Sequence, residues 1–359
     1  MRVIKKATII TIISLLVFTL SACWNNKDIN HRVMPVVMGI SMEGDEYKVF
    51  LQIPQPSKDT IQTKIVKGTG KTINHAVDKI TTDMESSIDL LHLKVIIIEE
   101  KFAQKGVKDL ISGFMRSRDV SPKAIVAICD DDFDQFFSRM SKSTEAEGTA
   151  LLDFFEKNAG WTPEIALTRV WQVYRSIHSY TKDVAIPIIG LAKENMLVNQ
   201  IGSAVIKNGK MVDQIDSDET LLFNAFNGES TQGKIEVTDE GTVLILGNTM
   251  VHESKFLNER SFIISKIKLK VMLLETKGNP PTKLIKKELE TLLKRRFNEM
   301  FTKLQKSEAD ILGLGQYFRN KIPRKELKHW RSEYYPELSM DFQVFVDIQN
   351  EGNLTTHND

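Results

Sequence analysis

The sequence has few cysteines: its 359 residues include only Cys23 and Cys129. Two cysteines are too few for the disulfide framework of a small secreted domain or for a zinc site built from thiolates. The seven histidines include no pair spaced four residues apart, as a zinc protease needs, and no Gly-x-Ser-x-Gly element is present. We therefore expect no catalytic residue, no metal ligand and no cofactor, and we predict that the chain is not an enzyme.

An excess of one charge sign is also absent, because 48 Lys and Arg residues balance 47 Asp and Glu residues. This balance predicts no binding to nucleic acid. The stretch "KGTGKT" at 67–72 lacks the first glycine of a nucleotide-binding P-loop, since Ile65 stands there, and it is expected to open a helix. The stretch "DDDFD" at 130–134 lacks the ligand spacing of a calcium loop and is expected to cap a helix.

The N-terminus carries Arg2, Lys5 and Lys6, followed by an apolar run over residues 7–20. A basic start and a short apolar core are typical of a secretory signal, whereas a membrane-spanning helix needs about 20 apolar residues. The run ends in Leu20-Ser21-Ala22-Cys23, which looks like a bacterial lipobox. We predict that residues 1–22 are a lipoprotein signal peptide and that Cys23 is lipidated as the first residue of the mature chain.

Two alternatives remain open for this region. The apolar run could be an uncleaved anchor, or Cys23 could form a disulfide with Cys129. However, Cys129 ends the aliphatic run "AIVAIC", which predicts a buried strand in which the thiol acts as a small hydrophobic group. Either kind of anchor places the rest of the chain on the extracytoplasmic face of a membrane.

Hydrophobic periodicity predicts an α+β fold with three mixed domains, each a small β-sheet packed with α-helices. The N-terminal domain is expected over 23–193, where a hairpin precedes alternating helices and strands. A small middle domain is expected over 194–255, with a hairpin turn at Asn208-Gly209. The C-terminal domain is expected over 256–352, with a long helix at 282–306 and an alternating strand at 339–348, before a polar tail at 353–359.

Aromatic residues gather near the C-terminus, where Trp330, Tyr334 and Tyr335 form a candidate interface. Such residues concentrate binding energy when they are exposed. They equally suit the core of a small domain, and their helical spacing before a strand favours that second interpretation. The strand from Ile201 to Val212 is the other candidate surface for a partner.

The order of several short motifs resembles the C-subunit lipoproteins of bacterial spore germinant receptors, the Ger(x)C or GerAC-like family. Members typically begin with Cys-Trp-Asp, an acidic residue and a strand ending in Gly-Ile-Asp. Later they carry Gly-x-Ala-Val-Phe-Lys-x-Gly-Lys-Leu-Val and Asp-Ile-Phe-Gly-Phe-Gly. The similar segments here are Cys23-Trp24-Asn25, Asp28, Val36–Ser41, Gly202–Val212, Asp310–Gly315, Trp330 and Tyr335–Leu338. This chain departs from the family pattern at Asn25 and Ser41, where the family usually has Asp.

The resemblance implies a three-domain α+β lipoprotein without enzymatic activity. It implies attachment to the outer face of the spore's inner membrane and contacts with membrane-embedded A- and B-type receptor subunits. An alternative is a solute-binding lipoprotein that delivers a ligand to a transporter, which predicts two similar lobes around a cleft. A cell-envelope hydrolase is a further class, but it requires a nucleophile or metal constellation that the motifs do not supply.

Overall fold

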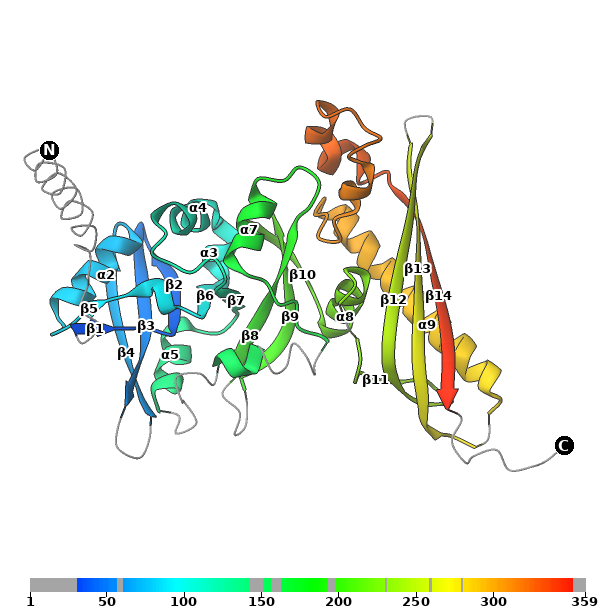
Figure 1. Cartoon of the computed structure of the whole chain (residues 1–359), viewed down its shortest axis with the longest axis horizontal. Coiled ribbons are helices and arrows are strands. Elements are labelled where there is room, and N and C mark those ends of the chain that lie inside the picture. Colours follow the sequence, from blue (N-terminus) through cyan, green and yellow to red (C-terminus); the bar gives the residue numbers. More distant parts are fainter. Residues whose placement is uncertain are drawn as a thin grey trace, which may run out of the picture.

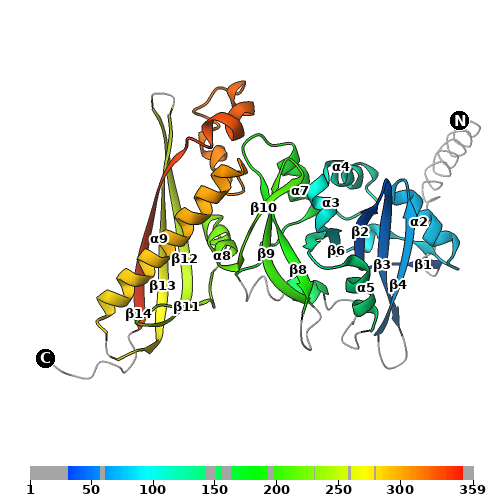
Figure 2. The ribbon, with the colours of Figure 1, turned by 180° about the vertical axis from the view of Figure 1, so that it is seen from behind.

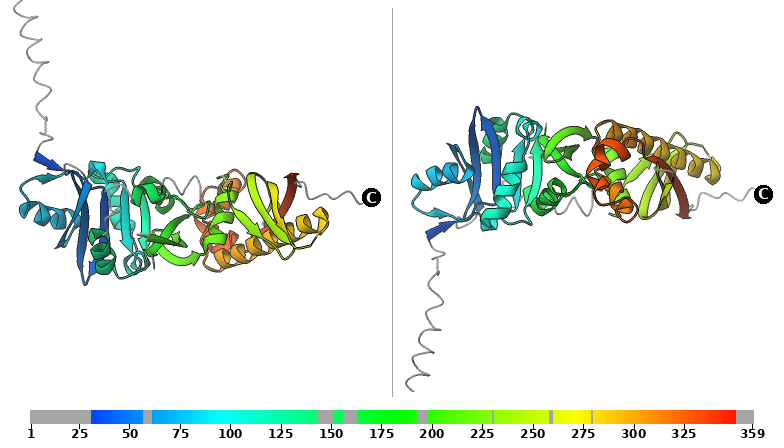
Figure 3. Two further views of the ribbon diagram at one scale, coloured as in Figure 1. Left: turned by 90° about the horizontal axis from the view of Figure 1, so that it is seen from below. Right: turned by 90° about the horizontal axis from the view of Figure 1, so that it is seen from above.

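The computed structural model describes residues 31–56, 61–142, 151–155, 163–192, 198–229, 231–257, 260–278 and 280–350. Within them the chain forms an elongated body that runs from its N-terminal part at one end to its C-terminal part at the other (Figures 1 and 3). Two large sheets with helices on their faces confirm the α+β class. Cys23 and the predicted signal peptide lie outside the described residues.

The first sheet has eight strands in the order β10-β9-β8-β7-β6-β2-β3-β4. Its central strands β2, β6, β7 and β8 are parallel, and antiparallel hairpins complete it on both sides. The strands are β2 (Val37–Glu43), β3 (Glu46–Pro56), β4 (Ile61–Gly70), β6 (Val95–Glu99), β7 (Ile125–Cys129), β8 (Val184–Leu191), β9 (Val198–Lys207) and β10 (Lys210–Ile215). A separate short pair joins β1 (Arg32–Val33) to β5 (Ser87–Ile88).

Helices cover both faces of this sheet, which is why its central strands are almost continuously apolar. One face packs against α2 (Ile73–Thr82), α3 (Glu100–Lys105), α4 (Lys108–Ser117) and α7 (Val170–Ile177). The opposite face packs against α5 (Phe133–Lys142). Cys129 lies in this second core, where burial raises the pKa of its free thiol to about 12. Its predicted role as a buried hydrophobic residue is confirmed.

Both stretches that superficially resemble ligand sites lead into helices, as predicted, although residues 67–70 of the first one form the end of β4. The Thr72 hydroxyl accepts a hydrogen bond from the His75 amide at 3.2 Å and caps α2. The Asp132 carboxylate accepts from the Gln135 amide at 2.8 Å at the start of α5. These oxygens satisfy amide groups that the first helical turn leaves unpaired.

The second sheet has the order β11-β12-β13-β14. Its strands are β11 (Ile235–Val237), β12 (Gly241–Leu257), β13 (Arg260–Thr276) and β14 (Ser339–Asn350). The long helix α9 (Thr282–Lys306) lies across one face, as Figure 2 shows. The predicted alternation of β14 is confirmed, since Phe342 and Val346 point into the core and Phe342 stacks on Phe297 at 3.8 Å between ring centroids.

The segment expected as a separate middle domain, 194–255, has no sheet of its own. The Asn208-Gly209 turn is correct, but its hairpin β9–β10 pairs with β8 in the first sheet, while β11 and β12 belong to the second. A two-stranded hairpin is marginal by itself and needs a third strand. The sequence pattern locates the turn but not the strand that completes the hairpin, and this is the physical reason for the correction.

The strands β8, β9 and β10 form a wall shared by two cores. One face contributes Ile186 and Ile206 to the core of the N-terminal helices. The other contributes Ala185 and Val205 to the core that contains α8 (Ser217–Phe226), α9 and the second sheet. On the N-terminal side, β8 pairs with β7 through only two residue pairs, Ile128↔Ile188 and Cys129↔Ile189. Side-chain packing on both faces therefore holds the wall to both parts of the chain, with little strand pairing to β7.

Gly39 in the middle of β2 marks a close approach between the sheet and α5. A Cβ atom at this position would lie 2.2 Å from Cζ of Phe137 and 2.3 Å from its Cε2. Phe137 is itself held by stacking on Phe50 at 4.7 Å and by edge contacts with Phe133 and Phe136. The ring has no free direction in which to move, so only glycine fits.

We predict that Gly39→Ala lowers the free energy of unfolding by ~1–3 kcal/mol, because an added methyl group overpacks this core. Gly113→Ala is the matched control, since a Cβ there meets nothing within 4 Å and Gly113 lies inside α4. The control should gain ~0.5–1 kcal/mol from its higher helix propensity. Urea titration followed by circular dichroism measures both, and equal shifts in the two variants would contradict the packing explanation.

Candidate functional site

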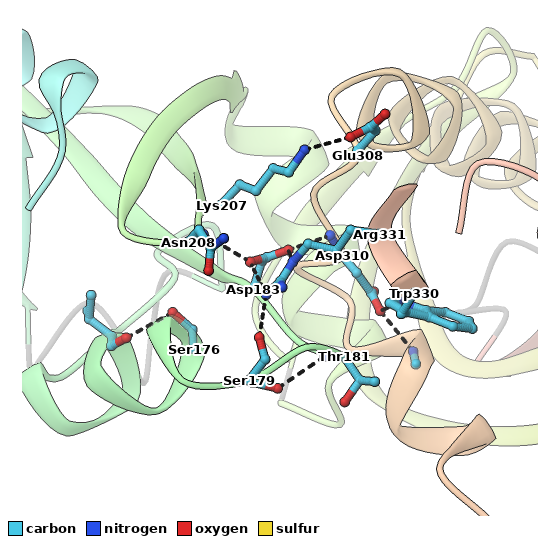
Figure 4. Close-up of polar contacts among 12 residues, drawn as sticks. Ser176, Ser179, Thr181, Asp183, Lys207, Asn208, Glu308, Asp310, Trp330 and Arg331 are labelled. Atoms are coloured by element: carbon cyan, nitrogen blue, oxygen red, sulfur yellow. Dashed lines mark hydrogen bonds and ion pairs between the residues drawn. The ribbon is translucent and has the colours of Figure 1, made fainter. Parts of the chain in front are cut away.

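A buried polar cluster joins the segment before β8 to the segment after α9, and we call it the joint (Figure 4). It consists of Asp183, Asp310, Trp330 and Arg331. Asp183 stands just before β8, and Asp310 follows α9. Trp330 and Arg331 lie in η6 (Trp330–Tyr334), a turn of π-helix between α9 and β14. Asp183, Asp310 and Trp330 are completely buried.

Asp183 and Arg331 form a bidentate ion pair inside the joint. Arg331 Nε donates to Asp183 Oδ2 and Arg331 Nη2 donates to Asp183 Oδ1, each at 2.8 Å. Arg331 Nη2 also donates to the Ser179 carbonyl at 2.7 Å. Two parallel charge-assisted bonds fix both side chains in one geometry. The pair therefore connects residues 148 positions apart in the sequence.

Asp310 is the second buried acidic residue of the joint. Its carboxylate accepts hydrogen bonds at 2.8 Å from the amides of Leu314 and Gly315 and from Nε1 of Trp330. Its backbone amide donates to Asp183 Oδ2 at 3.0 Å, so the two acidic residues are linked directly. Burial raises the pKa of Asp310 to about 6, although the three N–H donors favour its charged form.

Gly315 marks a close approach between the two segments. A Cβ atom there would lie 2.7 Å from Thr181 Cβ and 2.7 Å from Cε2 of Trp330. The Trp330 ring stacks on Phe318 at 5.3 Å between centroids. The rim of the joint is closed by an ion pair between Lys207 and Glu308 at 2.8 Å, which is more exposed. At Gly315 the backbone of the 310–315 segment therefore lies directly against the indole ring of Trp330.

The joint is a network of internal hydrogen bonds. The guanidinium, both carboxylates and the indole N–H bond to one another or to nearby backbone groups. Among the described residues, no three His, Cys, Asp or Glu side chains are placed to hold a metal ion. The joint can therefore hold two parts of the chain in register.

The structure separates the three predicted interface residues. Trp330 and Tyr335 are completely buried, so the core interpretation that their helical spacing favoured is confirmed, and their listing as candidate interface residues is wrong. Aromatic residues at helical spacing look the same in either setting, which is the reason for the error. Tyr334 is half-buried and packs beside Phe256 at 6.2 Å, and a role at an interface stays a prediction for it.

The other predicted surface is the hairpin β9–β10. Ile201 and Val212 are 38% and 42% exposed there. Much of the hairpin is buried as part of the shared wall, for example Val205 and Ile206. Exposed apolar residues at its margin are compatible with a partner, and this role also stays a prediction.

Sequence reasoning missed Asp183 and Arg331. Each is a single charged residue in an ordinary segment, and no spacing relates one to the other. A partial signal existed for Asp310 and Gly315, which belong to one of the family-like motifs. That signal marked the positions without indicating that they form a buried joint.

A groove of about 1040 Å³ lies along the outer side of α9, bounded by β14 and by Asp213 of β10. We call it the α9 groove. Its helix side carries Lys287, Lys294 and Arg295, and its strand side is formed by 343–345 of β14. It is open to solvent and separate from the joint. Its mixed charged and apolar lining makes it the second place where a partner could bind.

No helix among the described residues is long and apolar enough to cross a membrane.

Comparison with protein families matches two consecutive models to almost the whole chain. Residues 25–191 match the spore germination protein N-terminal domain, and residues 201–352 match the domain described as spore germination B3/GerAC like, C-terminal. The two models meet near residue 193, where the sequence analysis placed its first boundary. The eight-stranded sheet nevertheless continues across this boundary.

Individual relatives agree with this assignment. The chain is 22% identical to spore germination protein GerQC of Bacillus cereus, covering 80% of this chain and 82% of the relative. It is 20% identical to spore germination protein KC of Bacillus subtilis (strain 168) over 97% of both chains. It is also 23% identical to the putative spore germination protein YfkR of the same organism over 98% of both chains.

The crystal structure of the GerBC protein has a similar fold. The TM-score is 0.59 at 17% sequence identity, and the match covers 87% of this chain and 97% of GerBC. From the two domain matches, the full-length relatives and this shared fold, the chain belongs to the GerAC-like family of spore germination proteins, the C subunits of germinant receptors.

Proposed function

We propose that this chain is a lipid-anchored, non-enzymatic subunit of a nutrient germinant receptor. It is held through Cys23 on the outer face of the spore's inner membrane and acts through contacts with membrane-embedded A- and B-type subunits. The observation that carries the proposal is the match of both germination domains over 25–191 and 201–352. The lipobox-like string before Cys23 supports the anchor.

The described body begins at residue 31, a few positions after Cys23, with β1 at one end of the elongated molecule (Figure 1). The second sheet and α9 lie at the opposite end. An anchor at Cys23 therefore attaches to one end of a long body and leaves the α9 groove at the far end. Two or three acyl chains suffice for stable attachment, whereas a single chain binds only marginally.

The joint supports a role as a carrier of binding surfaces. The polar groups that lie between the two parts of the chain bond to one another, and this fixes the C-terminal part against the shared wall. The solute-binding alternative expects two similar lobes around a cleft, and the eight-stranded and four-stranded sheets are unequal. No observation on the described residues favours that alternative.

The anchor predicts different outcomes for the two cysteines. Cys23→Ala should release the protein from the membrane fraction and reduce germination on the cognate nutrient, because the acylated sulfur is lost. Cys129→Ala is the control and should stay membrane-bound, since Cys129 is buried in the core. Membrane fractionation and mass spectrometry of the N-terminus measure the result. A Cys23→Ala protein that is still fully membrane-bound, with unchanged germination, would refute the anchor.

The ion pair of the joint predicts a large loss of stability. Arg331→Ala leaves the buried Asp183 carboxylate without its counter-ion, with only backbone amides such as that of Asp310 as donors, which should cost ~3–5 kcal/mol. Lys207→Ala removes the exposed ion pair at the rim and should cost less than ~1 kcal/mol. Denaturant titration of the mature chain compares the two variants. Similar losses would show that the buried pair does not fix the joint.

Asp310 predicts a pH-dependent difference in stability. Burial favours its neutral form and raises its pKa from 3.8 to about 6, so the folded chain binds more protons than the unfolded chain between these values. The resulting stability is complete below about pH 4 and is lost as the pH rises through 6. Between pH 4 and 7 the wild type should lose ~3 kcal/mol relative to Asp310→Asn, which does not titrate. Parallel stability curves for the two proteins would contradict this.

A further inference from the structure

We propose that the free edge of β14 and the outer side of α9 form a slot for one added β-strand, supplied by an extended acidic segment of a partner protein. The inference rests on the proposed function only in that the partner is expected among the receptor's membrane subunits. The slot itself is argued from the geometry of β14, the lining of the α9 groove and the charges on α9.

Strand β14 is an edge strand. It pairs on one side with β13, in parallel, and it is the last strand of its sheet. The Val346 amide faces the free edge, where Glu290 of α9 accepts its hydrogen bond at 2.9 Å. Because amides alternate along a strand, those of Phe342 and Val344 face the same edge. Among the described residues no side chain is recorded capping these two amides, so this part of the edge is open to another strand.

The α9 groove lies beside this open part. Gln343, Val344 and Phe345 line it from the strand, and α9 lines it from Lys287 to Lys306. The space is open to solvent along α9, unlike a pocket that encloses a small ligand. A helix packed across a sheet, with room beside the last strand, is the arrangement in which strand addition provides main-chain hydrogen bonds and side-chain contacts together.

The cations of the groove favour an acidic occupant. Four of them form no ion pair with another described residue and are exposed, namely Lys287, Lys294, Arg295 and Lys306. Their neighbours on the same helix are already paired, for example Arg296 with Glu236 and Lys303 with Glu219. Two acidic residues of the lining, Asp213 and Glu299, form no described ion pair either, and a third, Glu290, bonds the Val346 amide. The unpaired cations outnumber the unpaired acids, which provides charge complementarity to an anionic segment.

Phe345 supplies an apolar anchor on β14 at the border of the slot. It is 45% exposed, and it lies on the face of the sheet opposite to the buried Phe342 and Val346. On an added strand, a side chain opposite Phe345 would pack against its ring as a cross-strand pair. Exposed aromatic residues of this kind concentrate binding energy when a partner covers them.

The experiment places a photo-crosslinking amino acid at Phe345 of the full-length chain in spores. The matched control carries it at Val251, which is 62% exposed on β12 of the same sheet. After irradiation, the receptor is purified from detergent-solubilised spore membranes and the crosslinked peptides are sequenced. We expect position 345, and not position 251, to crosslink to an acidic segment of an A- or B-type subunit.

Charge reversal tests the specificity of that crosslink. Lys294→Glu combined with Arg295→Glu should reduce the crosslink yield at position 345 by about tenfold, which corresponds to ~1.4 kcal/mol. Lys266→Glu combined with Lys268→Glu changes the same charge on exposed residues of β13 and should leave the yield unchanged. Hydrogen exchange at the amides of Phe342 and Val344 should slow in the receptor relative to the isolated chain, because an added strand bonds to them.

The outcomes distinguish this inference from the proposed function. A crosslink from position 345 to residues 351–359 of the same chain, or to a second copy, would overturn the partner assignment. Copurification with the membrane subunits, but with no crosslink at 345 and no effect of charge reversal, would overturn the slot and leave the proposed function intact. If the chain copurifies with no membrane subunit at all, the proposed function itself fails.

Discussion

The bidentate ion pair between Asp183 and Arg331 is the interaction on which the arrangement of the two sheets depends. A buried charge without its partner is costly, so each residue requires the other. Asp183 directly precedes β8 of the first sheet, and Arg331 lies in the last connection before β14 of the second. When the ion pair forms, it fixes the distance and the relative orientation of the two segments that carry Asp183 and Arg331. The apolar core shared by β8–β10, α8 and α9 provides most of the adhesion, and the ion pair selects one register for it.

Much of the secondary structure was predictable because it depends on local periodicity. The helix at 282–306 and the alternating strand at 339–348 were found correctly, since each exposes one face and buries the other over many residues. The turn at Asn208-Gly209 was found because both residues adopt positive φ, which this dipeptide favours. The grouping of strands into sheets was not predicted, because no residue pattern within β9 indicates that this strand pairs with β8.

The joint was not predictable for the same reason. Asp183 and Arg331 are 148 positions apart, and each looks like any surface charge in its own segment. Trp330 illustrates a different limit, since its helical spacing favours burial but does not identify its buried partners. Its indole N–H in fact satisfies the buried Asp310 carboxylate, and its ring leaves no room for a side chain at Gly315. The partners of Trp330 therefore lie 12–20 positions earlier in the chain, where the residues that flank it give no sign of them.

The motif positions that resemble the family have packing explanations rather than chemical ones. Gly39 allows a phenylalanine ring of α5 to touch the sheet, and Gly315 allows an indole ring to touch the chain. The buried Asp310 carboxylate accepts hydrogen bonds from three N–H groups, which fixes their positions. The use of these residues for internal contacts is consistent with a protein that acts by presenting surfaces to partners.

The position of the open strand edge follows from the same organisation. The first sheet ends in β10 and the second in β14, and residues of both strands border the α9 groove. A free edge is an aggregation hazard unless it is blocked or used, and within the described part of the chain the Glu290 side chain blocks the amide of Val346 alone. With the proposed lipid anchor at one end, the protein does not rotate freely to bury such an edge against other copies. A partner held in the same membrane meets it at a restricted orientation, which lowers the entropic cost of strand addition.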